Sequence, residues 1–230
     1  METTPDTIAR VQLEVWSDIA CPWCYVGRRN LSVAIADLEE HDRPEVQWRA
    51  YQLDPTIPAD GVETEAYFTQ RFGADRSRFD ESRERLTAMG EELGIAFRWD
   101  RQRVIANTRL AHRVLAAAEP HGLREEVMDA LFAANFERGI DIGDEAALRE
   151  LVAEVDADLA DELVDAAVQD PSFDALVASE IDLGRELGIT GVPCFVADRA
   201  IAVPGAVPPP VLAQLLAEAA SRRAAAGDED

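Results

Sequence analysis

Two cysteines in a C-x-x-C pattern, Cys21 and Cys24, stand where a predicted strand gives way to a predicted helix. Val11–Trp16 alternates apolar and polar residues, which is typical of a strand, and a helical apolar stripe follows up to about Glu40. A cysteine at the start of a helix lies beside free backbone N–H groups and the positive end of the helix dipole. Both stabilise a thiolate, so the pattern predicts a reactive cysteine pair at the end of a strand.

The order of these residues suggests a role for each of them. Cys21 is the predicted nucleophile, and Cys24, one turn later and facing inward, is predicted to resolve the mixed disulfide. Pro22 suits the first position of a helix because it has no N–H to lose, and Trp23, which carries no charge, is predicted to form an apolar platform beside the sulfur. Asp18 is predicted either to fasten the loop by accepting backbone N–H bonds or to relay a proton to Cys24.

Two other interpretations of the cysteine pair remain open, a zinc half-site and a pair of inert buried thiols. Zinc takes about four ligands. Cys194 offers a third, but the three histidines are scattered and no fourth ligand is evident. We therefore predict no metal site.

A distant segment, Gly191-Val192-Pro193, precedes another predicted strand. An X-Pro bond in a tight turn is a candidate cis peptide, which exposes the preceding backbone N–H and C=O. These three residues are therefore predicted to bind substrate backbone beside the reactive sulfur. Cys194 follows at once, and it is interpreted either as a small buried apolar residue or as a third redox thiol.

Composition narrows the class of protein. With 230 residues, 47% of them hydrophobic, the chain can bury a proper core, and no apolar run reaches the roughly 18 residues of a membrane span. An odd count of three cysteines is not a disulfide scaffold. The first residues lack the basic start and apolar stretch of a secretory signal, so a cytoplasmic location is expected.

The charge balance is strongly acidic. There are 45 acidic against 22 basic residues, a net charge of −23, and every basic residue is arginine. Such a field repels nucleic-acid backbones and anionic membranes, and neither is expected as a partner. The surface indicates adaptation to molar salt, where charges are screened within about 3 Å; the arginine preference of a GC-rich genome is the alternative.

The pattern along the chain predicts an α/β fold with a large all-helical insertion. A second strand is expected over Glu45–Leu53, and only helices are expected from Glu63 to about Val168. Asn107 is predicted to cap one of them and to border the active-site groove. A helix, two short strands and a final helix follow. The predicted domains are residues 10–61 with 171–225, and the helical insertion 62–170.

This arrangement resembles the DsbA-like thioredoxin fold, in which a strand, C-P-x-C, a helix, a strand and a helical insertion precede G-V-P and a terminal hairpin and helix. Further motifs are similar to the FrnE branch of that family: Ser17-Asp18, Cys21–Gly27, Asn107-Thr108, Ala111–Arg113 and Gly205-Ala206. The resemblance implies a cytosolic thiol–disulfide oxidoreductase or isomerase that acts on disulfide-containing proteins or small thiols. It implies no cofactor, with glutathione as a candidate redox partner, and it leaves a homodimer open.

Two other functions are carried forward. One is a glutathione-dependent isomerase or transferase, as in the related 2-hydroxychromene-2-carboxylate isomerases and kappa-class glutathione transferases, although these typically have serine where Cys21 stands. The other is a non-catalytic chaperone that binds extended peptides between the core and the helical insertion.

Overall fold

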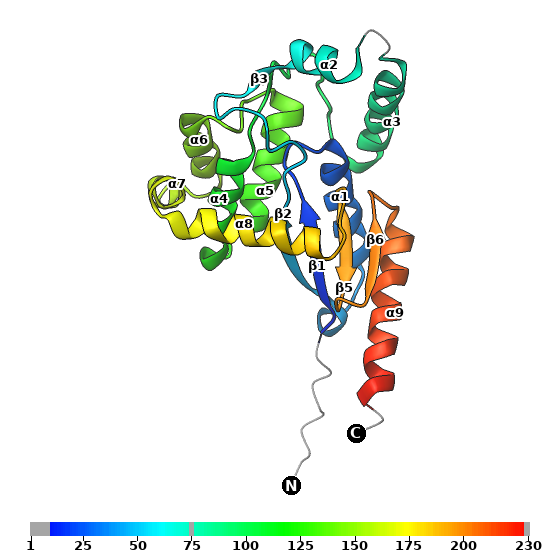
Figure 1. Cartoon of the computed structure of the whole chain (residues 1–230). Helices are drawn as coiled ribbons and strands as arrows, with labels where there is room; N and C mark the ends of the chain where they lie inside the picture. Colours follow the sequence, from blue (N-terminus) through cyan, green and yellow to red (C-terminus); the bar gives the residue numbers. More distant parts are fainter. Residues whose placement is uncertain (1–9, 74–75, 228–230) are drawn as a thin grey trace.

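The computed structural model describes residues 10–73 and 76–227, and the expectation about a secretory signal falls on residues outside these ranges. A four-stranded mixed sheet lies at the centre of the molecule (Figure 1), in the order β2-β1-β5-β6. Its strands are β1 (Gln12–Ser17), β2 (Glu45–Ala50), β5 (Cys194–Ala197) and β6 (Ile201–Pro204). β1 is parallel to β2 and antiparallel to β5, so the first strand occupies a central position between segments from both ends of the chain.

Helices cover both faces of this sheet. α1 (Pro22–Ala36) connects the parallel strands β1 and β2 and packs beside α9 (Pro209–Gly227), whereas α8 (Pro171–Glu186) crosses the other face against β2. Because side chains alternate along a strand, β1 contributes Val15 to the core on the α1 side and Trp16 to the α8 side. Both residues are fully buried. The continuous burial of β1 after Gln12 is therefore that of a strand covered on both faces.

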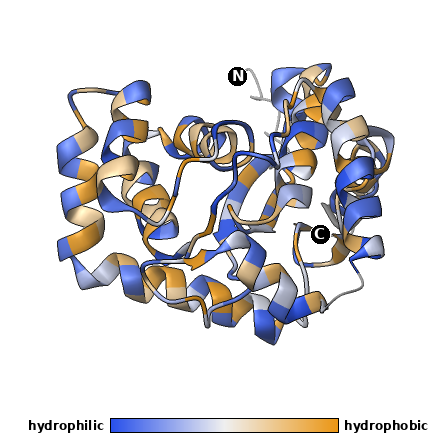
Figure 2. Ribbon diagram, turned by 90° about the horizontal axis from the view of Figure 1, so that it is seen from above, coloured by the Kyte–Doolittle hydropathy of each residue, from blue (hydrophilic) through white to orange (hydrophobic). Residues whose placement is uncertain are grey.

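The segment from Glu63 to about Val168 is almost entirely helical, as expected. Its long helices are α2 (Thr64–Phe72), α3 (Ser77–Leu93), α4 (Arg109–Ala118), α5 (Arg124–Ala133), α6 (Glu145–Val155) and α7 (Ala160–Gln169). Short helical turns occur at Glu40–Asp42, Glu119–His121 and Ala134–Arg138. The helices are striped with hydrophobic and hydrophilic residues (Figure 2), which is the pattern of elements that each bury one side.

The expectation of helices alone in this segment was wrong in one respect. β3 (Val62–Glu63) and β4 (Val104–Ile105) form a small antiparallel ladder. Two-residue strands are too short to show an alternating pattern, so the sequence gives no signal for them. The second sheet strand also ends at Ala50, earlier than expected. The small ladder joins the start of α2 to the segment that leads into α4.

The helical insertion and the sheet share one core. Tyr25 of α1 stacks on Phe132 of α5 with ring centroids 5.1 Å apart, and its hydroxyl donates to Glu137 at 2.7 Å. Asn135 Nδ2 donates to the carbonyl of Ile19, in the loop before α1, at 3.1 Å. The helical insertion therefore contacts both the first turn of α1 and the loop before it, and fixes their position. The proposed domain limits remain a prediction.

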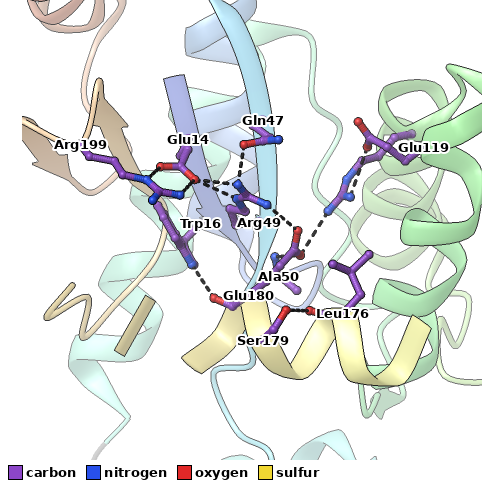
Figure 3. A network of polar contacts seen from close by, with 11 residues as sticks. Glu14, Trp16, Gln47, Arg49, Ala50, Glu119, Leu176, Ser179, Glu180 and Arg199 are labelled. Carbon is purple, nitrogen blue, oxygen red and sulfur yellow. Dashed lines mark hydrogen bonds and ion pairs between the residues drawn. The ribbon is translucent and has the colours of Figure 1, made fainter. Parts of the chain in front are cut away.

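A polar network fastens α8 to the sheet (Figure 3). Glu14 of β1 forms ion pairs with Arg49 and Arg199, each at 2.7 Å, and Arg49 also contacts Glu180 of α8 at 3.2 Å. Glu180 further accepts the Ala50 backbone N–H at 2.8 Å. The hydrogen bond from Arg199, the largest effect, outweighs burial and lowers the pKa of Glu14. Glu14 is thus a structural anion on the face of the sheet opposite α1.

In the described part of the chain, no helix is both long and apolar enough to cross a membrane.

Candidate active site

Cys21 occupies the N-cap position of α1. Its φ and ψ of −96° and 111° are extended, Pro22 begins the helix, and the Cys21 carbonyl accepts the backbone N–H of Cys24 at 3.0 Å. The first turn of α1 contains no acidic residue. The Cys21 sulfur therefore lies at the positive end of a helix dipole, and no acidic side chain within the first turn of α1 opposes a thiolate there. This is the placement that the sequence predicted.

The second segment of the site is the loop at Pro193. The Val192–Pro193 peptide is cis, as expected. The Cys21 thiol donates to the Val192 carbonyl across 3.5 Å, which joins residues far apart in the sequence. Gly27 makes this approach possible, because a Cβ there would lie 2.9 Å from Pro193 Cγ. The backbone of Val192 is thus beside the reactive sulfur, where a bound chain can pair with it.

Cys24 lies behind Cys21, fully buried, whereas Cys21 retains 4% of its surface. Burial, the largest effect, raises the pKa of Cys24, and the hydrogen bond and charge of Cys21 raise it further. The Asp18 backbone and the Ser17 hydroxyl act in the opposite direction through hydrogen bonds. Cys24 is therefore held as a thiol behind the exposed edge of Cys21, an arrangement suited to a resolving cysteine.

Asp18 fastens the loop before Cys21. Its carboxylate accepts the backbone N–H groups of Ala20 at 3.2 Å and Leu53 at 2.7 Å. The Nε2 atom of His112 lies 3.4 Å from the same carboxylate and 2.9 Å from the Tyr51 carbonyl. These contacts support the loop-fastening interpretation of Asp18 over the proton relay. They also identify His112 as a buried packing residue.

Asn107 makes the side-chain bond of an N-cap at the start of α4. Its Oδ1 atom accepts the Arg109 backbone N–H, two residues ahead, at 2.9 Å, whereas Thr108, the residue just before the helical range, makes no side-chain cap bond. The Nδ2 atom of Asn107 donates to the Ile57 carbonyl at 2.6 Å. The two bonds use different atoms, so the side chain caps α4 and also ties the loop after β2 to the start of that helix. Its neighbour Thr108, and not Asn107, lines the cleft described below.

Cys194 lies on the other face of the sheet from the cysteine pair. It packs with Trp16, Ile189 and Val196, whereas Cys21 and Cys24 belong to the core on the α1 side. Burial raises the pKa of the Cys194 thiol. Both observations support its interpretation as a small apolar residue and give no support to a third redox thiol.

A cleft of about 380 Å³ opens beside Cys21. Cys21, Pro22, Trp23, Gly191 and Val192 line it. Trp23 is half-buried there, and its role as a platform stays a prediction. An aromatic wall comes from α2, α3 and the segments that follow α3 and α5, and its residues are Tyr67, Phe68, Phe72, Phe79, Trp99 and Phe136. Sequence reasoning missed this wall, because aromatic residues on amphipathic helices give the same signal as ordinary core.

The described residues contain no cluster of three or more histidine, cysteine or acidic side chains that could hold a metal ion.

A central sheet with a C-x-x-C pair at a helix N-terminus and a cis-proline loop beside it defines the thioredoxin-fold class. Residues 12–217 match the DSBA-like thioredoxin domain family, and the chain belongs to that family of thiol oxidoreductases. The resemblance noted from the sequence is thereby confirmed, and so is the fold, a DsbA-like thioredoxin fold with a helical insertion.

Particular relatives agree with this assignment. A probable DsbA oxidoreductase from Streptomyces coelicolor is 34% identical, with a TM-score of 0.81 over 91% of this chain and 89% of that one. The protein YwbO from Bacillus subtilis is 27% identical over 85% of this chain and 90% of its own length. The cytosolic disulfide reductase DsbM from Pseudomonas aeruginosa, solved with glutathione, shares the fold at 19% identity, with a TM-score of 0.62 over 95% of this chain and 98% of that one.

Proposed function

We propose that this protein is a cytoplasmic thiol–disulfide oxidoreductase or isomerase in which Cys21 attacks and Cys24 resolves. The observation that carries the proposal is the position of the Cys21 sulfur. It lies at the N-terminus of α1, 3.5 Å from the Val192 carbonyl, with Cys24 buried one turn behind it. Asp18 holds the loop, and Gly191, Val192 and Pro193 form the edge on which a substrate backbone binds.

The reaction needs only the two thiols and a substrate disulfide. The Cys21 thiolate attacks one substrate sulfur, the substrate S–S bond breaks, and one substrate thiolate leaves. Cys24 then loses its proton and attacks Cys21, which forms the Cys21–Cys24 disulfide and releases the second substrate thiol. The protein is oxidised by two electrons and the substrate is reduced by two. An isomerase uses the first step alone and reverses it on another sulfur.

A cytoplasmic location and a small-thiol partner complete the proposal. The DsbM relative is described as a cytosolic reductase and was solved with glutathione, which supports glutathione as the redox partner that returns the disulfide to the dithiol. No bound cofactor is needed for either half-reaction. Disulfide-containing proteins and small thiols are the proposed substrates.

The test compares single cysteine variants in an insulin-reduction assay coupled to glutathione. Cys21→Ser is expected to lower the rate to that of the uncatalysed reaction, because the attacking sulfur is lost. Cys24→Ser is expected to accumulate a mixed disulfide. Cys194→Ser, the matched control, is expected to stay within about twofold of the unmodified protein, since it lies on the opposite face of the sheet. A double variant of Cys21 and Cys24 with the unmodified rate would contradict the proposal.

A glutathione-dependent isomerase or transferase is the second candidate, and the cleft favours it. An aromatic-lined cavity of about 380 Å³ fits a small apolar molecule beside Cys21. This function predicts saturable glutathione binding and activity that survives Cys24→Ser. If disulfide reduction is the function, Cys24→Ser is instead expected to stop at the mixed disulfide and to show no repeated catalytic cycles.

A further inference from the structure

Arg83, on α3, lines the same cleft as Cys21 and Val192. Its guanidinium carbon lies 4.2 Å from the ring centre of Phe79 and 5.2 Å from that of Trp99. A third ring, Phe68, lies at 5.3 Å. The side chain is half-buried, and its Nε–H is shielded from solvent without a hydrogen-bond partner. A permanent cation is thus enclosed by aromatic faces at the wall of the cavity.

Two cations close to the cleft pair with carboxylates, and Arg83 does not. Arg71 pairs with Asp54 at 3.4 Å, and Arg76 pairs with Glu65 at 2.7 Å. Within residues 10–73 and 76–227, Arg83 forms no ion pair with a carboxylate. Asp80 and Glu65 act on it only through longer-range attraction, while burial and the Arg76 charge lower its pKa. A guanidinium remains charged under such conditions.

The guanidinium of Arg83 is half-buried and has no carboxylate partner among the described residues. Partial removal of a charge from water has a cost unless an anion lies beside it. Contacts with the ring faces compensate part of the cost. The fork of guanidinium N–H groups suits a planar carboxylate, which can accept two of them at once.

We propose that Arg83 binds the carboxylate of a small aromatic thiol or disulfide whose sulfur reacts at Cys21. This rests on the proposed disulfide chemistry and names its substrate class. The carboxylate meets Arg83, the ring lies among the aromatic side chains of the cleft, and the sulfur lies at the Cys21 end. The cavity volume of about 380 Å³ is that of a site for one small molecule.

The redox step is a full thiol–disulfide exchange. The Cys21 thiolate forms a bond to one sulfur of the aromatic disulfide, whose S–S bond breaks to release one aromatic thiolate. Cys24 gives up its proton to solvent and attacks Cys21, which releases the second aromatic thiolate. One protein disulfide forms, and one aromatic disulfide becomes two thiols.

The experiment compares two aromatic disulfides on the reduced full-length protein. Dithiobis(nitrobenzoate) carries one carboxylate on each ring, and dithiodipyridine carries none. Arg83→Gln is expected to lower the second-order rate constant for the carboxylate reagent about tenfold, the loss expected for one partly exposed charge-assisted contact. The rate with the neutral reagent is expected to change less than about twofold. Arg83→Lys, which keeps the charge but loses the fork, should fall between the two.

Arg78→Gln is the matched control, because it removes the same charge from an exposed position of α3 outside the cleft. It is expected to leave both rates unchanged within about twofold. Equal slowing of both reagents by Arg83→Gln, or slowing by Arg78→Gln as large as that by Arg83→Gln, would overturn the inference.

A second measurement needs no variant and covers the case in which Arg83→Gln does not fold. Nitrobenzoate is expected to protect Cys21 in the unmodified protein from dithiodipyridine, whereas the neutral nitrobenzamide is expected to protect less. Equal protection by both compounds, or none by either, would overturn the carboxylate site. These outcomes are distinct from failure of the proposed function, because the cysteine variants in the insulin assay test that function without any carboxylate reagent.

Discussion

At the scale of single residues, the site separates the two thiols by their surroundings. Cys21 lies at a helix N-terminus with an open edge, whereas Cys24 is enclosed on all sides. Burial, followed by the contact with Cys21, raises the pKa of Cys24. Only the thiolate attacks a disulfide, so the second step depends on removing a proton from a buried sulfur.

This difference predicts how the second step varies with pH. Below a raised pKa, the thiolate fraction of Cys24 grows about tenfold for each pH unit. When the reduced protein reacts with dithiobis(nitrobenzoate), Cys21 forms a mixed disulfide and Cys24 then displaces the second equivalent of thionitrobenzoate. The rate of this second release should therefore rise steadily from neutral to alkaline pH. Stopped-flow absorbance measures this phase, and Cys24→Ser, which lacks the resolving thiol, should not show it. A second phase whose rate does not change with pH would contradict the assignment of Cys24.

At the scale of elements, α8 is held on the sheet by polar contacts as well as apolar ones. Glu180 is 4% exposed and meets the Arg49 guanidinium and the Ala50 backbone N–H. The backbone carbonyl of Glu180 also accepts the indole N–H of Trp16 at 2.9 Å (Figure 3). These bonds set the position of α8 on the face where Cys194 is buried. Each buried charge of this network pairs with one of opposite sign, so removal of one partner leaves a buried charge without part of its pairing.

Glu180→Gln is therefore expected to lower the free energy of unfolding by about 2–3 kcal/mol, at the lower end for a broken buried ion pair because Arg49 keeps Glu14. Asp182→Asn is the matched control on the same helix. The ion pair of Asp182 with Arg185 is exposed, so its loss should lower the free energy of unfolding by only about 0–1 kcal/mol. Denaturant unfolding measures both values. Equal losses for the two variants would show that the network does not anchor α8.

At the scale of the whole molecule, the acidic surface acts on stability. The net charge of −23 opposes compaction in dilute buffer, and molar salt screens it to within about 3 Å. The melting temperature should therefore rise by about 5 °C or more in molar potassium chloride, which corresponds to about 2 kcal/mol for a chain of this size. A sucrose solution serves as the control for general exclusion of solutes. A melting temperature that is the same in dilute buffer and in molar salt would contradict the halophilic interpretation.

The sequence contained much of the site but little of its surroundings. The placement of Cys21 and the cis bond at Pro193 follow from local patterns, a strand-to-helix junction and a turn before a strand. The capping bond of Asn107 follows from a local pattern too, but its contact with the Ile57 carbonyl does not. Arg83 was missed because its surroundings are also set by tertiary contacts. Its isolation depends on which residues fold against α3, and no spacing within a helix records that.

The central claim is that Cys21 is the attacking sulfur and Cys24 the resolving one. The most direct test is to incubate Cys24→Ser with glutathione disulfide under native conditions and to map the adduct by peptide mass spectrometry. We expect one glutathione per protein, bound to Cys21, with Cys194 unmodified, because burial raises the pKa of the Cys194 thiol and Cys194 lies on the opposite face of the sheet from the N-terminus of α1. A protein without an adduct, or an adduct on Cys194 instead of Cys21, would contradict the claim.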